Sequence, residues 1–413
     1  MSGVIKGRGR RGRSSDGVRS PTTQRQGLWH ATRDVGTILV FAVAPAAIVV
    51  LVLTASFLRG PILYDFKGGL YGAAQDIVHG RDPYRASELA HEAAMKKADE
   101  PGTEFSVPVY PAPALVAVVP IAQLPYRLAA LLFVAMSVGG LALALYLVEV
   151  RDWRCYGIAF ASWPVVHGLM LGALTPLLVL GIAVAWRLRG RLGSAAAVAA
   201  LVAVKVFPWP LALWLMATKR WRLAAVATAL AVAVTAAAWA AIGFDGLTAY
   251  PGMLRDLAFI EADASMSLSA GLMALGISSS AAQLCAVLVA VGLLGRAAWL
   301  ARRPAGERAA FILTVVAALI ASPIVWPHYF ALLLVPIALV SPRLSPLWFV
   351  PLLAYVGPVA HSHGHPWAIA PYLAMCAVVA GFGLTPGRLH PPRASRADRS
   401  APQLKPSIDL ASS

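Results

Sequence analysis

Ionisable side chains gather in one short stretch of this sequence, from Leu63 to Tyr84. It places carboxylates, a lysine, a histidine and paired glycines close together in a chain that is otherwise mostly apolar. A carboxylate such as Asp65 can act as a general base that takes a proton from a hydroxyl group. Cationic side chains elsewhere in the chain can stabilise an anion that forms nearby. This stretch is therefore the first candidate for chemistry.

The apolar run before the stretch predicts that it lies at a membrane surface. Residues 35–57 carry no charge. A helix of that length crosses the roughly 30 Å of hydrocarbon in a bilayer, for which about 20 residues suffice. Asp65 then follows shortly after a membrane exit, near the depth of the lipid headgroups. From Lys67, apolar residues recur at helical spacing up to Gly80, which predicts an amphipathic helix along the interface.

Composition is typical of a multi-pass membrane protein. Of the 413 residues, 59% are hydrophobic and 13% are charged, and uncharged runs of spanning length recur along the chain. The net charge of +16 lies mostly at the termini and in short turns. That pattern indicates cytoplasmic anchoring rather than nucleic-acid binding. We predict an all-α, polytopic fold with about 11 to 13 transmembrane helices.

The predicted organisation is a membrane domain between two basic tails. Residues 1–34 and 386–413 are expected to be disordered and cytoplasmic. Residues 35–385 form the membrane domain, with external loops at 59–110 and 243–269. The first loop holds eight of the chain's 19 acids and the second holds four, and no acid lies in the middle of an apolar run. This distribution suits an enzyme at the outer edge of the bilayer better than a transporter with ionisable groups at the midplane.

The crossings counted from the two ends of the chain disagree by one. If both tails are cytoplasmic, the disagreement falls between Tyr110 and Gly172. Either the short, proline-bounded run from Tyr110 to Leu124 is bent or enters and leaves at one face, or two apolar runs form a single span.

Several short motifs, in their order and spacing, resemble a known family. The first external loop contains Tyr64-Asp65-Phe66, Gly80-Arg81-Asp82-Pro83-Tyr84 and Tyr110-Pro111-Ala112-Pro113. Later segments are Lys205-Val206-Phe207-Pro208, Ala264-Ser265-Met266-Ser267-Leu268 and Ser322-Pro323-Ile324-Val325-Trp326-Pro327-His328. Together they resemble the polytopic glycosyltransferases of family 87, which have the GT-C fold. The chain departs from the family's Gly-Gln pair at Gly172-Ala173.

The resemblance implies a plasma-membrane enzyme of cell-envelope biosynthesis. It would transfer a sugar, expected to be α-linked mannose, from a polyprenyl-phosphate donor to a lipid- or glycan-linked acceptor hydroxyl at the extracytoplasmic face. Such transfer needs one general base and groups that stabilise the departing phosphate. A lone carboxylate suits an inverting displacement, unlike the paired carboxylates of glycosidases. The alternatives are an arabinofuranosyltransferase of the same family and a transporter or flippase of a lipid-linked precursor.

The resemblance also assigns roles to individual residues. Asp65 is the expected general base, and its alternative role is to cap the helix that follows. Lys205 and His328 are expected to bind the donor phosphate. Lys205 could instead extend to the membrane surface, and His328 could be an interfacial histidine whose hydrogen bonds are satisfied within the protein. The residues expected to bind the acceptor or the sugar are Tyr64, Asp82, Tyr84, Ser265, Ser267 and Trp326.

Two of these residues have simpler alternative roles, and no metal or cofactor is expected. Asp82 could form a turn before Pro83, and Ser267 could begin a helix. The three cysteines have no metal-ligand spacing and predict no disulfide framework. The histidines at 361, 363 and 365 have no acid or cysteine near them in sequence, which favours a polar turn over a metal site. We expect a monomer whose partners are the donor, the acceptor and membrane lipids, and not nucleic acid.

Overall fold

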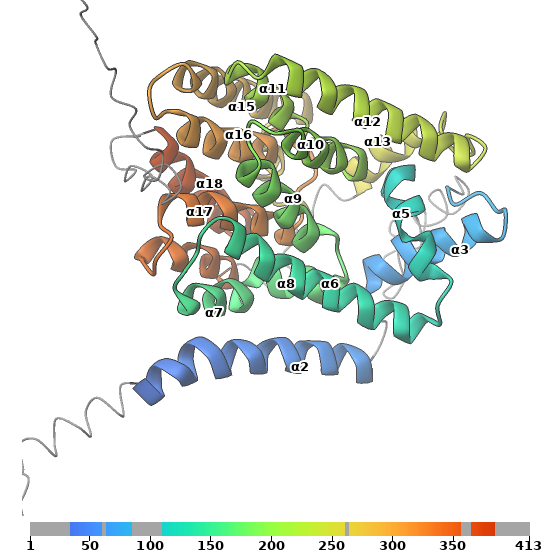
Figure 1. The fold of residues 1–413 in the computed structure, drawn as a ribbon, viewed down its shortest axis with the longest axis horizontal. Helices are drawn as coiled ribbons and strands as arrows, with labels where there is room; N and C mark the ends of the chain where they lie inside the picture. The colour runs from blue at the N-terminus through green and yellow to red at the C-terminus, as the bar shows by residue number, and fades with distance from the viewer. Residues whose placement is uncertain (1–33, 60–62, 85–109, 261–263, 357–364, 385–413) are drawn as a thin grey trace, which may run out of the picture.

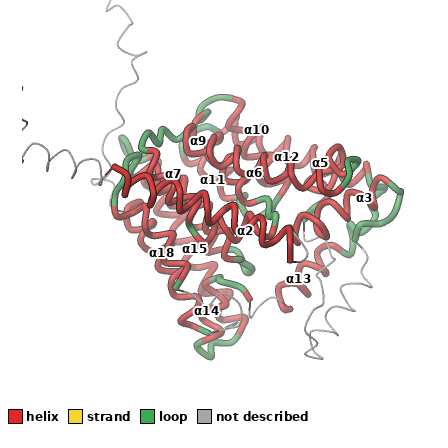
Figure 2. The backbone as a smooth tube through the Cα atoms, turned by 90° about the horizontal axis from the view of Figure 1, so that it is seen from below, coloured by secondary structure: helices red, strands yellow, loops and turns green. Residues whose placement is uncertain are grey.

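Helices make up the described part of the chain, and no strand occurs within it (Figures 1 and 2). The computed structural model describes residues 34–59, 63–84, 110–260, 264–356 and 365–384. The basic tails, most of the first external loop and the histidines at 361 and 363 lie outside these ranges. The expected domain boundaries stay predictions.

Five helices among the described residues are long and apolar enough to cross a membrane. They are Asp34–Leu51, Tyr126–Leu147, Trp221–Ala241, Ser279–Ala301 and Pro366–Leu384. Shorter apolar helices of 10–17 residues are Ala112–Ala122, Thr175–Arg187, Leu192–Val204, Pro327–Val340 and Pro346–Tyr355. The chain is therefore a helical membrane protein, while the total of about 11 to 13 spans and the GT-C fold stay predictions.

The elements of the first half follow the predicted apolar runs. In chain order they are η1 (Leu39–Val43), α2 (Ala44–Arg59), η2 (Asp65–Gly72), α3 (Ala73–Val78), α5 (Ala112–Ala122), α6 (Tyr126–Leu147), α7 (Trp153–Ala161), α8 (Trp163–Leu171), α9 (Thr175–Arg187), α10 (Leu192–Val204) and α11 (Pro210–Ala217). The apolar run at 155–170 is divided between α7 and α8. Pro164 lies in the first turn of α8, where a missing N–H does no harm, whereas it could not continue α7.

The second half contains more proline-induced breaks. Its elements are α12 (Trp221–Ala241), α13 (Tyr250–Ile260), α14 (Leu268–Ala274), α15 (Ser279–Ala301), α16 (Glu307–Ala321), η4 (Pro327–Leu333), α17 (Leu334–Val340), η5 (Pro346–Tyr355) and α18 (Pro366–Leu384). Helix α16 is buried on every residue from Ala309 to Ile320, so it forms the centre of the bundle. The predicted second loop at 243–269 contains α13, which the sequence analysis did not anticipate.

Helix α5 begins and ends against the same segment of the chain. At its start, the Tyr84 hydroxyl donates to the carbonyl of Tyr110 at 2.9 Å, and at its end the Tyr71 hydroxyl donates to the carbonyl of Leu124 at 2.9 Å. With 11 residues it is about 16 Å long, roughly half the hydrocarbon thickness. Figure 1 shows it beside α3, across the direction of the long helices. That the run from Tyr110 to Leu124 is bent or enters and leaves at one face stays a prediction, for which this short helix is the candidate.

The helix ends sort into two opposite faces. Helix α9 runs from Thr175 to Arg187, α10 returns from Leu192 to Val204, and α16 runs from Glu307 to Ala321. At one face, Arg189 and Arg220 both form ion pairs with Glu307, which joins three turns. We call this the basic face, defined by the turns 187–191, 219–222 and 302–307. The opposite ends, at Gly172, Lys205 and Ser322, define the second face.

Asp152 caps the N-terminus of α7, near the basic face. Its carboxylate accepts hydrogen bonds from the backbone N–H of Arg154 at 3.2 Å, from the Arg154 guanidinium at 2.9 and 2.8 Å, and from the N–H of Leu344 at 3.3 Å. The hydrogen bonds from Arg154 lower the pKa of Asp152 to about 2. A carboxyl group with a lowered pKa stabilises the fold above its ordinary pKa near 4, and this contribution disappears as the pH falls toward 2.

We expect Asp152→Ala to lower the unfolding temperature of the detergent-solubilised protein at pH 7. The expected loss in the free energy of unfolding is about 1 kcal/mol, which is typical of a removed helix cap. The difference in unfolding temperature between the native and the variant protein should become smaller as the pH falls below about 4. Thermal unfolding measured between pH 7 and pH 3 checks this, with the exposed Asp245→Ala as control. A difference that stays constant over this range would contradict the assignment.

Candidate active site

Asp65 is the first residue of the π-helix η2, Asp65–Gly72, which continues as α3. Tyr64 occupies the N-cap position, so the alternative role of Asp65 as the helix cap is not seen. A carboxylate in the first helical turn is stabilised by the helix dipole. π-Helices are rare and occur frequently at functional sites. The local backbone therefore holds Asp65 at the start of a helix and not within a loose turn.

Apolar contacts on both sides fix the position of Asp65. Leu63 and Phe66 are fully buried, and the ring of Phe66 stacks on Phe133 of α6 with 4.4 Å between centroids. On the other side lies Gly172, whose backbone has φ +69°. A Cβ on Gly172 would lie 2.8 Å from the Cβ atoms of both Leu63 and Phe66. Only a glycine lets the α8–α9 turn approach the Asp65 segment this closely.

Lys205 lies in a box of aromatic rings. It follows α10 in an extended conformation, and only 9% of it is exposed. Its ammonium nitrogen lies 4.2 Å from the ring centroid of Tyr329, 4.7 Å from that of Tyr110 and 5.8 Å from that of Trp326. These distances fit cation–π attraction. Because the ammonium is enclosed by rings, the alternative in which Lys205 extends to the membrane surface does not fit the structure.

Asp65 and the lysine box are close enough to interact electrostatically. The negative charge of Asp65 acts on Lys205 and on the hydroxyl groups of Tyr110 and Tyr329. The Lys205 ammonium is in contact with the rings of Tyr110 and Tyr329, and the Asp65 carboxylate is near enough for its charge to act on all three. These four side chains come from four separate parts of the chain, which the packing of η2, α5, α10 and η4 brings together.

A pocket of about 300 Å³ opens beside Lys205. Besides Lys205, its walls include Pro111, Phe207, Tyr250, Trp326 and Tyr329. One buried cation among aromatic and apolar side chains is an arrangement that can take an anionic group attached to an apolar or ring-shaped body. Of the predicted residues, Lys205 and Trp326 line this pocket, whereas Asp65 is not part of its wall.

His328 is more deeply buried than Lys205. Its ring lies beside the ring of His167, which is not among the predicted site residues. His328 is 1% exposed, and neither ring nitrogen has a hydrogen-bond partner among the described residues. Its ring centroid lies 5.6 Å from that of His167 and 6.2 Å from the parallel ring of Trp326. In the sequence, the feature that could have indicated His167 is a lone histidine within an apolar run. The unpartnered ring nitrogens of His328 do not match its alternative role as a hydrogen-bonded interfacial histidine, and its expected contact with phosphate stays a prediction.

Asp82 and Tyr84 support the site from the side. The Asp82 carboxylate accepts a hydrogen bond from the backbone N–H of Tyr84 at 2.7 Å, as expected of a turn-forming aspartate. Tyr84 is 2% exposed, and its ring stacks on Trp239 at 5.1 Å. Since its hydroxyl holds the carbonyl of Tyr110, Tyr84 positions one wall of the lysine box. Tyr64, next to Asp65, is half-buried.

Ser265 and Ser267 hold neighbouring segments together. The Ser265 hydroxyl accepts from the N–H groups of Ser267 at 3.2 Å and Val325 at 3.1 Å, which ties this segment to the residue before Trp326. Ser267 caps α14 by accepting from the N–H of Ala270 at 3.1 Å, so its alternative role as a helix start is seen. Binding of a substrate by these two serines stays a prediction.

Metal ligands do not gather in the described part of the chain. No group of three or more His, Cys, Asp or Glu side chains that could hold a metal ion occurs there. Cys155, Cys285 and Cys376 are free.

The comparison with protein families gives the site its context. The sequence model of glycosyltransferase family 87 matches residues 109–323, which is more than half of the chain. The chain belongs to glycosyltransferase family 87. No curated protein and no solved structure matches the sequence. The family and the apolar helices together make this a membrane glycosyltransferase, which acts on a sugar donor and an acceptor.

The family match covers part of the candidate site of this family 87 protein. Tyr110 and Lys205 lie within residues 109–323, whereas Asp65 precedes the matched range and Trp326 follows it. The packing of Asp65 near Lys205 is therefore an observation independent of the match.

The close approach at Gly172 leads to a testable expectation for this family 87 protein. Gly172→Ala should push the Asp65 segment away and lower both sugar transfer and stability, the latter by about 1–3 kcal/mol. Gly243→Ala is a matched control, because Gly243 also has φ +69° but has nothing within 4 Å of an added Cβ. Thermal unfolding and transfer rates of the two variants should separate the clash from backbone strain. Equal losses of stability and of sugar transfer in the two variants would mean that the close contact of Gly172 with Leu63 and Phe66 has no special role.

Proposed function

We propose that this family 87 protein transfers mannose from a polyprenyl-phosphate donor to a hydroxyl of a lipid- or glycan-linked acceptor. The acceptor oxygen attacks the anomeric carbon as its proton passes to the Asp65 carboxylate. The bond between the anomeric carbon and the phosphate oxygen breaks, and its electrons stay with the phosphate next to Lys205. The observation that carries the proposal is the aromatic-lined pocket that includes the buried Lys205, with the Asp65 carboxylate outside the pocket wall but near enough for its charge to act on Lys205.

The chemistry of this pocket suits a lipid-phosphate leaving group. The ammonium of Lys205 is held by rings and is therefore placed before the substrate arrives, which lowers the reorganisation required in the transition state. Trp326 and Tyr329 offer flat apolar surfaces on which a sugar ring can pack. A lone base such as Asp65 fits an inverting displacement, in which a single base removes the acceptor proton.

The charge distribution supports an extracytoplasmic site. The turns at 187–191, 219–222 and 302–307 carry Arg and Lys residues at the face opposite Asp65. Basic turns mark the cytoplasmic side of membrane proteins. The Asp65 face would then meet the outside of the plasma membrane, where lipid headgroups and a polyprenyl phosphate lie at the same depth.

The placement of ionisable residues favours an enzyme over a transporter or flippase. Among the described buried residues, the ionisable side chains Lys205 and His328 both lie near the Asp65 face. From there to the basic face, the described buried polar residues are serines and threonines, such as Ser194 and Thr314. A transport path would need ionisable or hydrated groups along the whole depth. Arabinofuranosyl transfer would use the same residues and differs only in the donor.

Membranes that contain the protein, supplied with radiolabelled polyprenyl-phosphate-mannose, test the proposal. We expect a labelled glycolipid that is absent from membranes without the protein, and little product from polyprenyl-phosphate-arabinose. A preference for the arabinose donor would support the alternative within the family. No product from either donor, together with translocation of a lipid-linked sugar across vesicles, would overturn the enzymatic proposal.

A further inference from the structure

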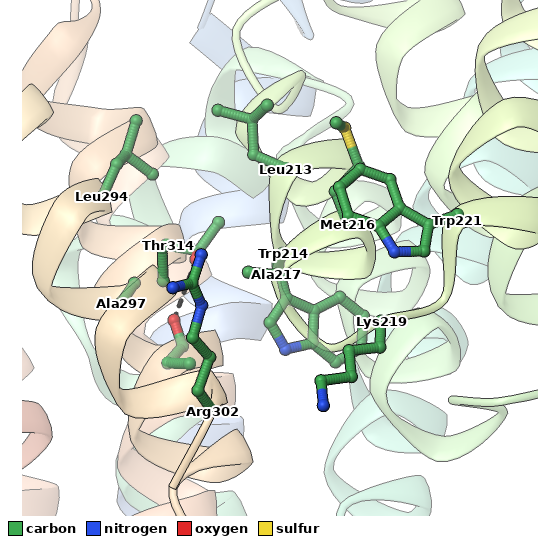
Figure 3. A pocket seen from close by; sticks show the side chains of 12 residues that line it. Leu213, Trp214, Met216, Ala217, Lys219, Trp221, Leu294, Ala297, Arg302 and Thr314 are labelled. Carbon is green, nitrogen blue, oxygen red and sulfur yellow. Dashed lines mark hydrogen bonds between the residues drawn. The ribbon is translucent and has the colours of Figure 1, made fainter.

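A second pocket, of about 620 Å³, opens at the basic face (Figure 3). It lies between α11 and the start of α12 on one side and α15 and α16 on the other. Apolar side chains form most of its wall, and they include Leu213, Met216 and Leu294. Lys219 and Arg302 stand on its two sides. The pocket belongs to the opposite end of the bundle from Lys205, so it is separate from the candidate active site.

The two cations at this pocket have neither a counter-charge nor a ring contact among the described residues. Arg220 pairs with Glu307, and Arg303 lies 4.1 Å above the ring of Trp299. Lys219 and Arg302 are exposed, and neither forms an ion pair or a side-chain hydrogen bond within the described part of the chain. Two positive charges therefore border one apolar pocket with nothing in the described structure to neutralise them.

A buried hydrogen-bond donor belongs to the same pocket. Trp214 is 1% exposed, and its indole nitrogen has no hydrogen-bond partner among the described residues. Figure 3 shows the indole ring between Lys219 and Arg302, with its nitrogen on the side of the gap that separates them. A buried N–H without a partner destabilises the fold, and an acceptor in the pocket would offset that cost.

We propose that this pocket binds an anionic phospholipid. The phosphate accepts hydrogen bonds from Lys219, Arg302 and the indole N–H of Trp214, while the acyl chains lie along Leu213 and Leu294. Helix α15 continues the apolar path, since Leu288 is 59% and Val291 is 57% exposed on its surface. This inference concerns a different end of the bundle and does not rest on the sugar-transfer reaction.

A lipid fits this pocket better than a soluble anion does. A free phosphate would use only the two cations and the N–H, and would leave the apolar walls in contact with water. The exposed edge of Trp221, at 60%, adds an amphipathic ring of the kind that lies at lipid headgroups. Juxtamembrane Lys and Arg side chains attract anionic lipids, and a pocket between helices adds specificity for the headgroup.

The backbone conformation at Lys219 suggests a substitution that removes the positive charge without destabilising the fold. Lys219 has φ +62°, and the N–H of Arg220 donates to the carbonyl of Leu215 at 2.9 Å, which closes the end of α11 in the manner of a Schellman motif. Glycine is the residue best suited to this position. Lys219→Gly should therefore remove the ammonium while the lipid-free protein unfolds at the native temperature or above it.

Lipid binding can be measured on the purified full-length protein by native mass spectrometry and by thermal unfolding in detergent. Phosphatidylglycerol is the probe, and phosphatidylcholine and inorganic phosphate are the comparisons. We expect phosphatidylglycerol to bind the native protein and to raise its unfolding temperature. Lys219→Gly and Arg302→Gln should each weaken this binding about tenfold or more. Arg222→Gln removes a charge from the same face outside the pocket and should bind as the native protein does.

Three outcomes would overturn the proposal. Equal binding of phosphatidylcholine would mean that apolar packing alone fills the pocket. Equal weakening by Arg222→Gln would mean that the charge of the whole face attracts the lipid. Full protection by inorganic phosphate, without any effect of phosphatidylglycerol, would make the pocket a site for a soluble anion.

Discussion

Replacing Asp65 with asparagine should lower sugar transfer by about 10²- to 10⁴-fold, the usual contribution of a general base. Asparagine keeps the shape of the side chain but cannot accept the proton of the acceptor hydroxyl. Because the substitution is nearly isosteric, we expect the protein to insert, to extract and to unfold as the native protein does. Initial rates with radiolabelled polyprenyl-phosphate-mannose, normalised to the amount of folded protein, measure the effect. Asp65→Ala should be at least as impaired.

Asp76→Asn is the matched control for this variant. Asp76 lies in α3, in the same segment as Asp65, and forms an ion pair with Arg81 at 2.7 Å. An exposed pair of this kind contributes little, about 0–1 kcal/mol. Its loss should leave transfer close to native. Native transfer rates in Asp65→Ala would refute the assignment of the base.

Replacing Lys205 with methionine should lower transfer by about 10²- to 10³-fold, as expected when a preorganised group for a departing anion is lost. Methionine fills the space between Tyr110 and Tyr329 without a charge. Because negative charge grows on the phosphate oxygen as the bond breaks, the loss should appear mainly in kcat. The exposed Lys67→Met, in the same segment as Asp65, removes a lysine without touching the box and should keep its activity.

A double variant separates this role from a purely structural one. If Lys205 served only to neutralise Asp65, each single variant would leave one buried charge unpaired, and Asp65→Asn combined with Lys205→Met would recover stability and activity. Under the proposed mechanism the double variant stays as inactive as Asp65→Asn alone. Recovery of transfer in the double variant would therefore exclude catalytic roles for both residues.

Local sequence patterns predicted most of the helices, because apolar runs and proline positions decide them locally. In the sequence, Lys205 and the prolines at 208 and 210 interrupt an apolar stretch, and the structure breaks at that place between α10 and α11. The helix expected from Lys67 to Gly80 forms, and Gly80 ends it with φ +66°. It nevertheless starts at Asp65 as a π-helix, and that change of hydrogen-bond register leaves no mark on apolar spacing.

The composition of the site depends on contacts that no local pattern contains. The rings of Tyr110 and Tyr329 enclose Lys205, and the partner of His328 is His167, in another helix. Helix packing sets these contacts, and their sequence separation puts them beyond periodicity or motif spacing. The resemblance to family 87 selected Asp65, Lys205 and Trp326 together, which periodicity alone would not have done.

Helix α5 has a consequence for every topology map of this protein. If α5 enters and leaves at one face, as the sequence analysis predicts, a hydropathy count that treats residues 111–124 as a crossing assigns each later segment to the wrong compartment. Reporter fusions placed just before residue 85 and just after residue 124 should give the same signal. Antibody epitopes, labelling sites and truncation points chosen downstream should therefore be planned on the folded path of the chain and not on its hydropathy plot.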